Sequence, residues 1–536
     1  MRGRELHLLG GIVALAALAR FATLDQQSFW YDEAVTVGLV RMDFGDMLDR
    51  IPDSESTPPL YYVVGWVWAE VFGTGEIGLR SLSALCGTAF VPVAYAVGAR
   101  AVGVRVGLVA AALAAVNPLL VWYSQEARAY ALLVLVGGLS FLFFIRLLTG
   151  DPRRRTLVLW AVVSALALAT HYFAAFLVAI EAVWLLAAAA NRRPVAVAAA
   201  ALAAVEVAHL PLLLHQRSLN LADFIDDIPL GYRLARTPKQ FLVGFDAPGE
   251  VISGVAAGLL VVLALWFVWS RGDDRERRAA RIGLTVGAAL LAGTGLLAVV
   301  GVDYFDTRNV LVAWLPLALA VATGLGARHS GRAGLAATVA LALLSASTVL
   351  FVVTRESLQR DNWRGVADTL GKPHATPRAV VVTPSAAVQP FAVYRPALDP
   401  MPDAGVAVRE VALVALPVRR RTQSRPEEPP RPEAHRPPVL AGFALVEPPQ
   451  FEKTFTLLRY VSETPTLLTP ADLQGAHIES ERPSAVLIEG VARQSVAGAV
   501  PSTQRSSPPA TSFFQIGASA LIRSITSRAA ANASAR

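Results

Sequence analysis

The stretch that decides the fold is residues 6–34, which read LHLLGGIVALAALARFATLDQQSFWYDEA. Its first part, residues 6–24, is close to the ~20 apolar residues that a membrane-spanning helix needs. Trp30 and Tyr31 follow, and both residue types are enriched where a helix leaves the hydrocarbon. Two adjacent carboxylates, Asp32 and Glu33, come next. This order predicts a retained signal anchor whose outer end carries an acidic motif.

The composition of the whole chain is that of a membrane protein. Of its 536 residues 54% are hydrophobic and only 17% are charged, whereas a soluble domain has about 25% charged residues. The mean hydropathy is +0.48. The net charge of +7 comes with arginines that cluster in short loops between apolar runs, which is a topology signal and calls for no nucleic-acid partner. The single cysteine, Cys86, excludes an internal disulfide.

Apolar runs that are long enough to form membrane-spanning helices recur along the first two thirds of the chain. The sequence Asn117-Pro118 predicts a kink in the third of them. We expect about eleven spans, near residues 6–24, 79–99, 104–122, 130–148, 156–170, 173–190, 195–214, 250–270, 282–301, 309–326 and 333–353.

Residues 58–73 form a shorter run that is crowded with tyrosine and tryptophan and carries Glu70. If this run lies in the membrane interface, the arginine-rich loops all fall on the cytoplasmic side, as the positive-inside rule requires. If it spans the membrane, the later basic loops move outside. We therefore predict an amphipathic interfacial helix.

With this topology, polar residues gather at the outer ends of several helices. Helix caps could explain any one of these segments, but together they predict a shared site that faces outward. The segments are the first outer loop 25–78, residues 124–130, His171 with Tyr172, the loop 215–249, and residues 303–309.

The character of the sequence changes after Phe351, because no further spanning run follows. We predict a transmembrane domain over 1–353, a small extracytoplasmic mixed α/β domain over 354–465, and a mostly disordered tail over 466–536. Within the small domain, strands are expected over 378–396, 406–416 and 439–462, with a proline-rich loop over 417–438.

The adjacent carboxylates Asp32 and Glu33 cannot flank one bond as the paired carboxylates of a glycosidase do, because neighbouring side chains point in different directions. We expect one of them to face the reaction centre and the other to hold structure or bind a cation. A single carboxylate base suits a direct displacement. The alternative is a solvated start of a loop.

Arginines near the outer boundary could supply positive charge. Arg128 and Arg308 are candidate clamps for a lipid phosphate, because a guanidinium binds two oxygens of a phosphate in a bidentate manner. The alternatives are snorkelling or pairing with Glu126 and Asp306. His171 at a helix end could be a metal ligand, a proton carrier or a satisfied cap, and no second histidine stands at ligand spacing.

Several motifs that would indicate other chemistry are missing from the sequence. It has no P-loop, no GxGxxG before a helix, no HExxH and no CxxC pair. Their absence argues against nucleotide-driven or redox chemistry.

Five motifs, taken in order, resemble those of a known family of enzymes. They are FWYDEA at 29–34, TPPLYY at 57–62, LRSLSA at 79–84, YSQEARAY at 123–130 and DNWR at 361–364. The chain is similar over about residues 5–370 to the dolichyl-phosphate-mannose-protein mannosyltransferase-like enzymes, the GT-C membrane glycosyltransferases of glycosyltransferase family 39.

The resemblance implies a fold and a set of roles. The fold would be an α-helical polytopic membrane protein of the GT-C type, with about eleven transmembrane helices plus interfacial helices and the small α/β domain outside. Asp32 matches the catalytic base and Glu33 its neighbour. Gln125, Glu126, Arg128 and Tyr130 match a segment near the donor phosphate and sugar. To these substrate-binding candidates we add His171 and Arg308, although Asn309 stands where the family has a tyrosine.

The implied reaction moves a mannose-like hexose or a pentose from a polyprenyl-phosphate donor, with inversion, on the extracytoplasmic face of the cell membrane. The acceptor could be a glycan, a lipid or a protein. No cofactor is required. Whether the protein binds a divalent cation stays open, because some relatives use one and others do not. Two alternatives are a transporter or flippase of a lipid-linked sugar and a non-catalytic envelope scaffold.

Overall fold

The computed structural model describes residues 3–150, 153–221, 225, 228–371, 377–416, 437–476, 478 and 482–490. These residues form two compact units, each of which is described by itself. Residues 3–25 and 43–355 make up the membrane unit. Residues 26–42, together with the described residues from 356 to 490, make up the sheet unit.

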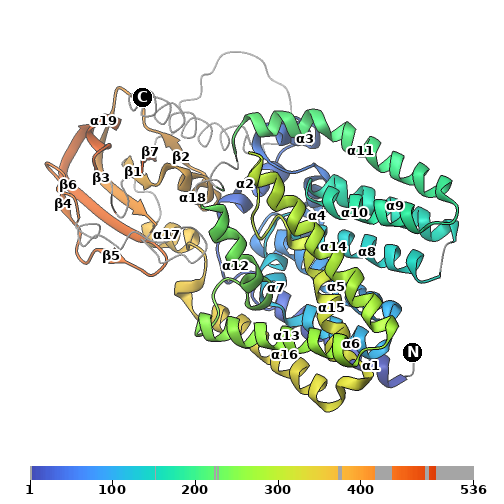
Figure 1. Cartoon of the computed structure of the whole chain (residues 1–536). Coiled ribbons are helices and arrows are strands. Elements are labelled where there is room, and N and C mark those ends of the chain that lie inside the picture. The colour runs from blue at the N-terminus through green and yellow to red at the C-terminus, as the bar shows by residue number, and fades with distance from the viewer. Residues whose placement is uncertain are drawn as a thin grey trace. The chain divides into compact units, whose positions relative to one another are not determined.

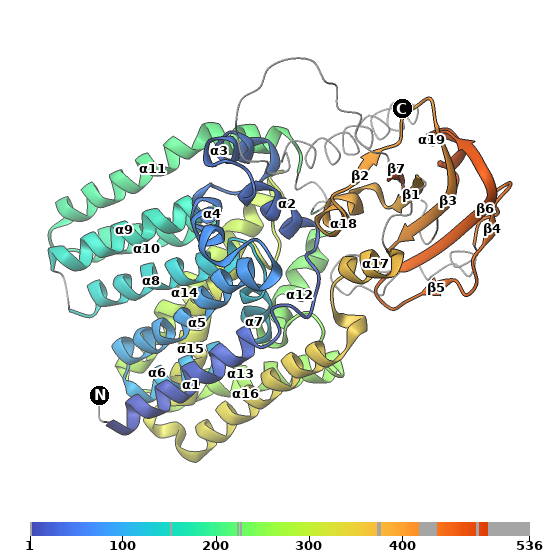
Figure 2. The same ribbon diagram turned by 180° about the vertical axis from the view of Figure 1, so that it is seen from behind.

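Every apolar run that the sequence predicts as a span is helical in the membrane unit, because a helix satisfies all its backbone polar groups internally. Figures 1 and 2 show α9, α10 and α11 side by side on one side of the bundle. The helices are α1 Gly3–Phe21, α5 Glu76–Ala101, α6 Val104–Val116, α7 Pro118–Ser124, α8 Tyr130–Leu148, α9 Arg154–Thr170, α10 Ala174–Ala188, α11 Arg192–Ser218, α13 Glu250–Arg271, α14 Asp274–Val299, α15 Trp314–Gly326 after the short η2 Leu311–Ala313, and α16 Gly331–Thr354 after η3 Arg328–Ser330.

The predicted kink is confirmed at Asn117-Pro118, where α6 and α7 meet at 58°. Pro118 has no N–H to continue the helix, and its ring clashes with the preceding turn. The side chain of Asn117 caps the new helix by accepting the N–H of Leu120 at 3.1 Å.

The described helices make this chain a multi-pass membrane protein. Six of them are long and apolar enough to cross a membrane, and the bent pair α6 and α7 would be a seventh. The helices α10 and α15 are apolar but shorter. The count of about eleven spans therefore stays a prediction.

Three shorter helices connect the long ones. They are α3 Phe44–Ser54, α4 Leu60–Phe72 and α12 Leu230–Val243. With 13 residues, α4 is ~20 Å long at 1.5 Å per residue, which is less than the ~30 Å of a hydrocarbon core. Its length fits the predicted interfacial helix, while its placement in the membrane stays a prediction.

The sheet unit is built on a mixed sheet with the strand order β2-β7-β1-β3-β6-β4, and β5 also pairs with β6. The central strands β1 and β3 run parallel, and the other pairs are antiparallel. The strands are β1 Arg378–Thr383, β2 Leu398–Pro400, β3 Val406–Ala415, β4 Ala444–Leu445, β5 Gln450–Phe451, β6 Thr456–Leu468 and β7 Ala485–Glu489.

Alternating residues of β1 give the sheet two buried faces. Val380 and Val382 pack with Trp363 and Phe391 on one face. These aromatic residues belong to the helices α17 Trp363–Leu370 and α18 Val388–Tyr394. The opposite face packs against residues that include Leu473 of the short helix α19 Pro470–Leu473.

The sheet unit differs from the sequence prediction in two places. The segment 378–396 is a strand only up to Thr383, and α18 follows because Ala387–Tyr394 places its apolar residues on one helical face against the sheet. The sheet also continues past residue 465, since β7 pairs with β1. The predicted loop 417–438 and the tail beyond 490 lie almost wholly outside the described residues.

Candidate active site

The acidic motif begins the helix α2, which spans Tyr31–Val40 in the sheet unit. Its two carboxylates stand in the first turn, where backbone N–H groups are without helical partners and a negative charge is favourable. Glu33 is completely buried, whereas Asp32 is partly exposed. The N–H of Trp30 donates to Oε2 of Glu33 at 3.4 Å, which helps to satisfy the start of the helix.

Glu33 also forms an ion pair with Arg360, whose Nη1 lies 3.2 Å from Oε2. The guanidinium of Arg360 lies over the ring of Trp30, 4.9 Å from its centre. A buried carboxylate needs such a cation, because desolvation would otherwise disfavour its charge. The buried and paired setting of Glu33 therefore suits a structural role.

In the membrane unit, Arg128 is buried and lies between two elements. Its Nη1 donates to Oε1 of Glu55 at 2.7 Å, and its guanidinium lies 5.9 Å from the centre of the Tyr62 ring. The hydroxyl of Tyr62 is hydrogen-bonded to Thr57 at 3.1 Å. Arg128 thus joins the segment before α8 to the segment around α4.

Arg308 follows α14 and has a carboxylate beside it, as the pairing alternative expected. Its Nε is 3.8 Å from Oδ1 of Asp306, while Oδ2 of Asp306 accepts a hydrogen bond from Arg236 of α12 at 3.1 Å. Asn309, at the position of the missing tyrosine, donates from its side chain to the carbonyl of Tyr304 at 2.8 Å. The asparagine therefore stabilises the loop 304–309 by an internal hydrogen bond.

His171 ends α9 and is buried. Burial, with the nearby charges of Arg308 and Arg128, lowers the pKa of His171 to about 3, so that the ring is neutral at pH 7. Its Nδ1 accepts the N–H of Phe173 at 3.3 Å, which leaves the proton on Nε2. His171 can therefore donate one hydrogen bond but carries no charge.

Tyr130 and Tyr123 complete the cluster. Their ring centres lie 4.9 Å apart, and the ring of Tyr130 is 6.0 Å from that of His171. The charges of Glu126 and Arg308 both act on the hydroxyl of Tyr123. We call the set Tyr123, Glu126, Arg128, Tyr130, His171 and Arg308 the outer cluster, after the side of the membrane that the sequence predicts for it.

Gln125 contacts a different part of the molecule from its neighbours Glu126 and Arg128. Its side-chain amide donates to the carbonyls of Ala19 and Arg20 and to the hydroxyl of Thr23, at 3.3, 3.2 and 2.8 Å. These groups end α1, where carbonyls lack helical partners. Gln125 therefore caps the first helix.

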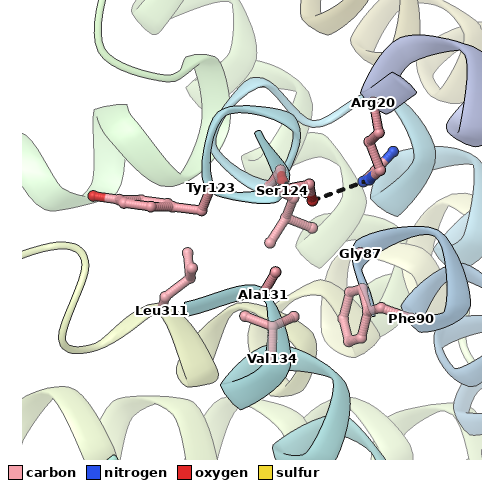
Figure 3. A pocket seen from close by; sticks show the side chains of 9 residues that line it. Arg20, Gly87, Phe90, Tyr123, Ser124, Ala131, Val134 and Leu311 are labelled. Atoms are coloured by element: carbon pink, nitrogen blue, oxygen red, sulfur yellow. Dashed lines mark hydrogen bonds between the residues drawn. The ribbon is translucent and has the colours of Figure 1, made fainter. Parts of the chain in front are cut away.

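Beside this contact lies a small cavity. Figure 3 shows Arg20 and Ser124 at its edge, joined by a hydrogen bond of 3.1 Å, with Phe90, Val134 and Leu311 among the residues that line it. Arg20 is completely buried, and its guanidinium donates to the carbonyls of Ala115 and Ala114 at 2.8 and 3.0 Å.

The structure brings together five predicted residues, namely Glu126, Arg128, Tyr130, His171 and Arg308. Asp32 and Glu33 lie in the other compact unit. Sequence reasoning missed the roles of Glu55, Arg236 and Arg20. An arginine within an apolar run was the available signal for Arg20, because a charge there needs partners. Among the described residues, no group of three or more His, Cys, Asp or Glu side chains is placed to hold a metal ion.

Comparisons with known proteins bear on the family and the fold. The family model described as dolichyl-phosphate-mannose-protein mannosyltransferase matches residues 56–213. The apo structure of ArnT from Cupriavidus metallidurans has a TM-score of 0.50 at 12% identity, covering 84% of this chain and 97% of that chain. ArnT bound to undecaprenyl phosphate gives the same values.

A third solved structure is the archaeal oligosaccharyltransferase AglB from Archaeoglobus fulgidus, in complex with an inhibitory peptide and a dolichol-phosphate. Its TM-score is 0.42 at 12% identity, with 73% of this chain and 64% of that chain covered. No curated protein sequence matches the chain. The resemblance drawn from the motifs is confirmed: the chain has the GT-C fold of ArnT and, over residues 56–213, the sequence pattern of the dolichyl-phosphate-mannose-protein mannosyltransferases.

Proposed function

We propose that this protein is an integral-membrane glycosyltransferase that moves a hexose or pentose from a polyprenyl-phosphate donor to an acceptor hydroxyl outside the cytoplasmic membrane. The observation that carries the proposal is the outer cluster, in which two arginines, a neutral histidine and two tyrosines come together at the ends of apolar helices. The fold of ArnT, which has been solved with undecaprenyl phosphate, supports the choice of donor.

The outer cluster suits a phosphate that becomes a leaving group. Arg128 is buried and Arg308 is mostly buried, so their charges act in a poorly screened environment. Charged donors already in place stabilise the negative charge that develops as the phosphate departs. His171 adds a neutral N–H that can bind a phosphate or sugar oxygen.

Asp32 is the proposed base. The acceptor hydroxyl gives its proton to the Asp32 carboxylate and attacks the anomeric carbon, while the bond from that carbon to the phosphate oxygen breaks. The electron pair leaves with the polyprenyl phosphate, and a single displacement inverts the anomeric configuration. Arginine supplies the positive charge for this step, so the proposal requires no cofactor. The carboxylates of Glu55 and Asp306 face arginines, a setting that favours ion pairing over binding of a divalent cation.

The decisive test is Asp32→Asn in the purified protein, assayed with polyprenyl-phosphate sugars. Losing the base should lower transfer by about 10²–10⁴-fold while folding stays normal. Asp46→Asn, an exposed acid on α3, is the matched control and should keep full activity. Retained turnover by Asp32→Asn would remove Asp32 from this role.

The acceptor can be found by profiling glycans, lipids and glycoproteins of a deletion strain beside a strain that carries Asp32→Asn. A transferase predicts the same missing product in both strains. Movement of a lipid-linked sugar across the membrane that survives in Asp32→Asn would instead favour a flippase. A defect in the deletion strain alone would favour a scaffold.

A further inference from the structure

Within the sheet unit, residues 27–33 at the start of the acidic helix α2 are held by several hydrogen bonds to residues 360–394. The hydroxyl of Ser28 donates to Oδ1 of Asn362 at 3.1 Å. The N–H of Phe29 donates to the hydroxyl of Tyr394 at 2.7 Å. The segment that precedes Asp32 is therefore fixed by residues that stand more than 300 positions later in the sequence.

Arg360 makes the most specific of these contacts. Its own N–H donates to Oε1 of Gln27 at 2.8 Å, while its side chain pairs with Glu33 at 3.2 Å and stacks on Trp30 at 4.9 Å. One residue thus contacts the chain before, at and after the start of α2. Lysine would keep the charge but would lose the planar group that stacks on an indole.

The contact also restrains the first turn of α2, from which Asp32 projects. Adjacent side chains leave a helix about 100° apart, so holding Glu33 toward Arg360 limits the directions in which Asp32 can leave the helix. A general base must lie within hydrogen-bond reach of the proton that it takes. An error of about 1 Å in placing such a group can lower the rate by about 100-fold.

We propose that Arg360 is a positioning residue, which orients the base Asp32 through Glu33 and Trp30 and thereby makes the sheet unit a part of the catalytic apparatus. This inference rests on the proposed function. It assigns to the carboxy-terminal third of the chain a role in the transfer step, in addition to any contact with an acceptor.

The test compares Arg360→Met and Arg360→Lys with the wild type in steady-state transfer assays. We expect kcat to fall by about 100-fold in Arg360→Met, with the KM for the donor changed by less than about threefold, because the donor contacts remain. Arg360→Lys should recover part of the rate by restoring a charge for Glu33. Arg409→Met, at an exposed arginine of β3, is the control and should behave as the wild type.

A second measurement separates positioning from general loss of structure. A cysteine placed at the exposed Tyr31 reports on the start of α2, and the single native thiol, Cys86, is buried. Thiol labelling at position 31 should become several-fold faster in Arg360→Met and stay unchanged in Arg409→Met. If Arg360→Met does not fold, the same comparison is made with Arg360→Lys, which should show a smaller change in the same direction.

The outcomes distinguish this inference from the function on which it rests. Full activity in Asp32→Asn would remove the proposed base. A dead Asp32→Asn beside an Arg360→Met with normal kcat and normal labelling would overturn only the positioning role. An equal loss of rate in Arg360→Met and Arg360→Lys, with unchanged labelling at position 31, would also overturn it.

Discussion

At the scale of single residues, the two neighbouring acids Asp32 and Glu33 differ in burial. Glu33 is buried and faces Arg360, whereas Asp32 is partly exposed. The sequence already implied that the two carboxylates could not act as a pair, because they point in different directions. It could not say which one holds structure, since that depends on Arg360, which lies far away in the chain.

The pKa of His171 leads to a prediction about stability. The folded pKa of about 3 lies below the ordinary value of 6.5, so between these values the unfolded chain binds a proton that the folded protein does not. The contribution of the neutral His171 ring to the free energy of unfolding is complete above pH 6.5 and is lost as the pH falls toward 3. Between pH 7 and pH 5 the melting temperature of the wild type should fall more than that of His171→Asn.

Thermal unfolding in detergent at both pH values measures this difference. His171→Asn serves as the control, because asparagine offers a hydrogen bond without titrating in this range. Parallel falls in the two proteins would mean that His171 is protonated in the folded state. The same neutral ring predicts that transfer activity between pH 5 and pH 7 does not follow the ionisation of His171.

At the scale of elements, the bend between α6 and α7 depends on a residue of α1. Pro118 has no N–H, so the carbonyl of Ala114 loses its helical partner at the bend. Arg20 donates to this carbonyl and to that of Ala115, and it also holds Ser124 at the end of α7. A buried arginine thus replaces the hydrogen bond that the proline removes.

Arg20→Met should therefore destabilise the protein. Two buried carbonyls would lose their donors, at a cost of roughly 1–3 kcal/mol each. We expect a melting temperature in detergent that is several degrees lower than that of the wild type. Arg192→Met, at an exposed arginine at the start of α11, should leave the melting temperature unchanged. A normal melting temperature for Arg20→Met would show that water satisfies these carbonyls.

The elements also show how far the sequence can be interpreted. The helices of the membrane unit were predicted because long apolar runs have few other solutions in lipid. In the sheet unit, α18 was predicted as a strand, since a short apolar stretch fits either structure until its packing partner is known. The strand β7 was missed because its partner β1 lies about a hundred residues earlier.

The residues of the candidate site also divide into those that the sequence could identify and those that it could not. Arg128, His171 and Arg308 could be named from their positions at the ends of apolar runs, and Tyr130 from the family resemblance. Their partners Glu55 and Arg236 could not be named, because they come from short helices or loops that no long apolar run marks in the sequence. Pairing of Arg128 with Glu126 was one alternative from the sequence, whereas the pair of Arg128 with Glu55 was not foreseen.

At the scale of the whole molecule, the basic loops predict which side of the membrane each helix end faces. Arg154 at the start of α9 should be cytoplasmic, and Asp46 on α3 should be outside. In intact cells, an impermeant thiol reagent should label Asp46→Cys but not Arg154→Cys. After the cells are opened, both variants should react, while the wild type stays unlabelled because Cys86 is buried. Labelling of Arg154→Cys from outside would reverse the topology and turn α4 into a span.

The membership of residues 26–42 in the sheet unit has a consequence for biosynthesis. The acidic helix leaves the ribosome early, but the residues that hold its start are translated more than 300 residues later. At about 5–20 residues per second, tens of seconds pass before Arg360 is made. During this time the newly inserted helices face the lipid pool while the segment that bears Asp32 still lacks its support. If Asp32 is the base, a nascent chain therefore stays inactive until the sheet unit has folded.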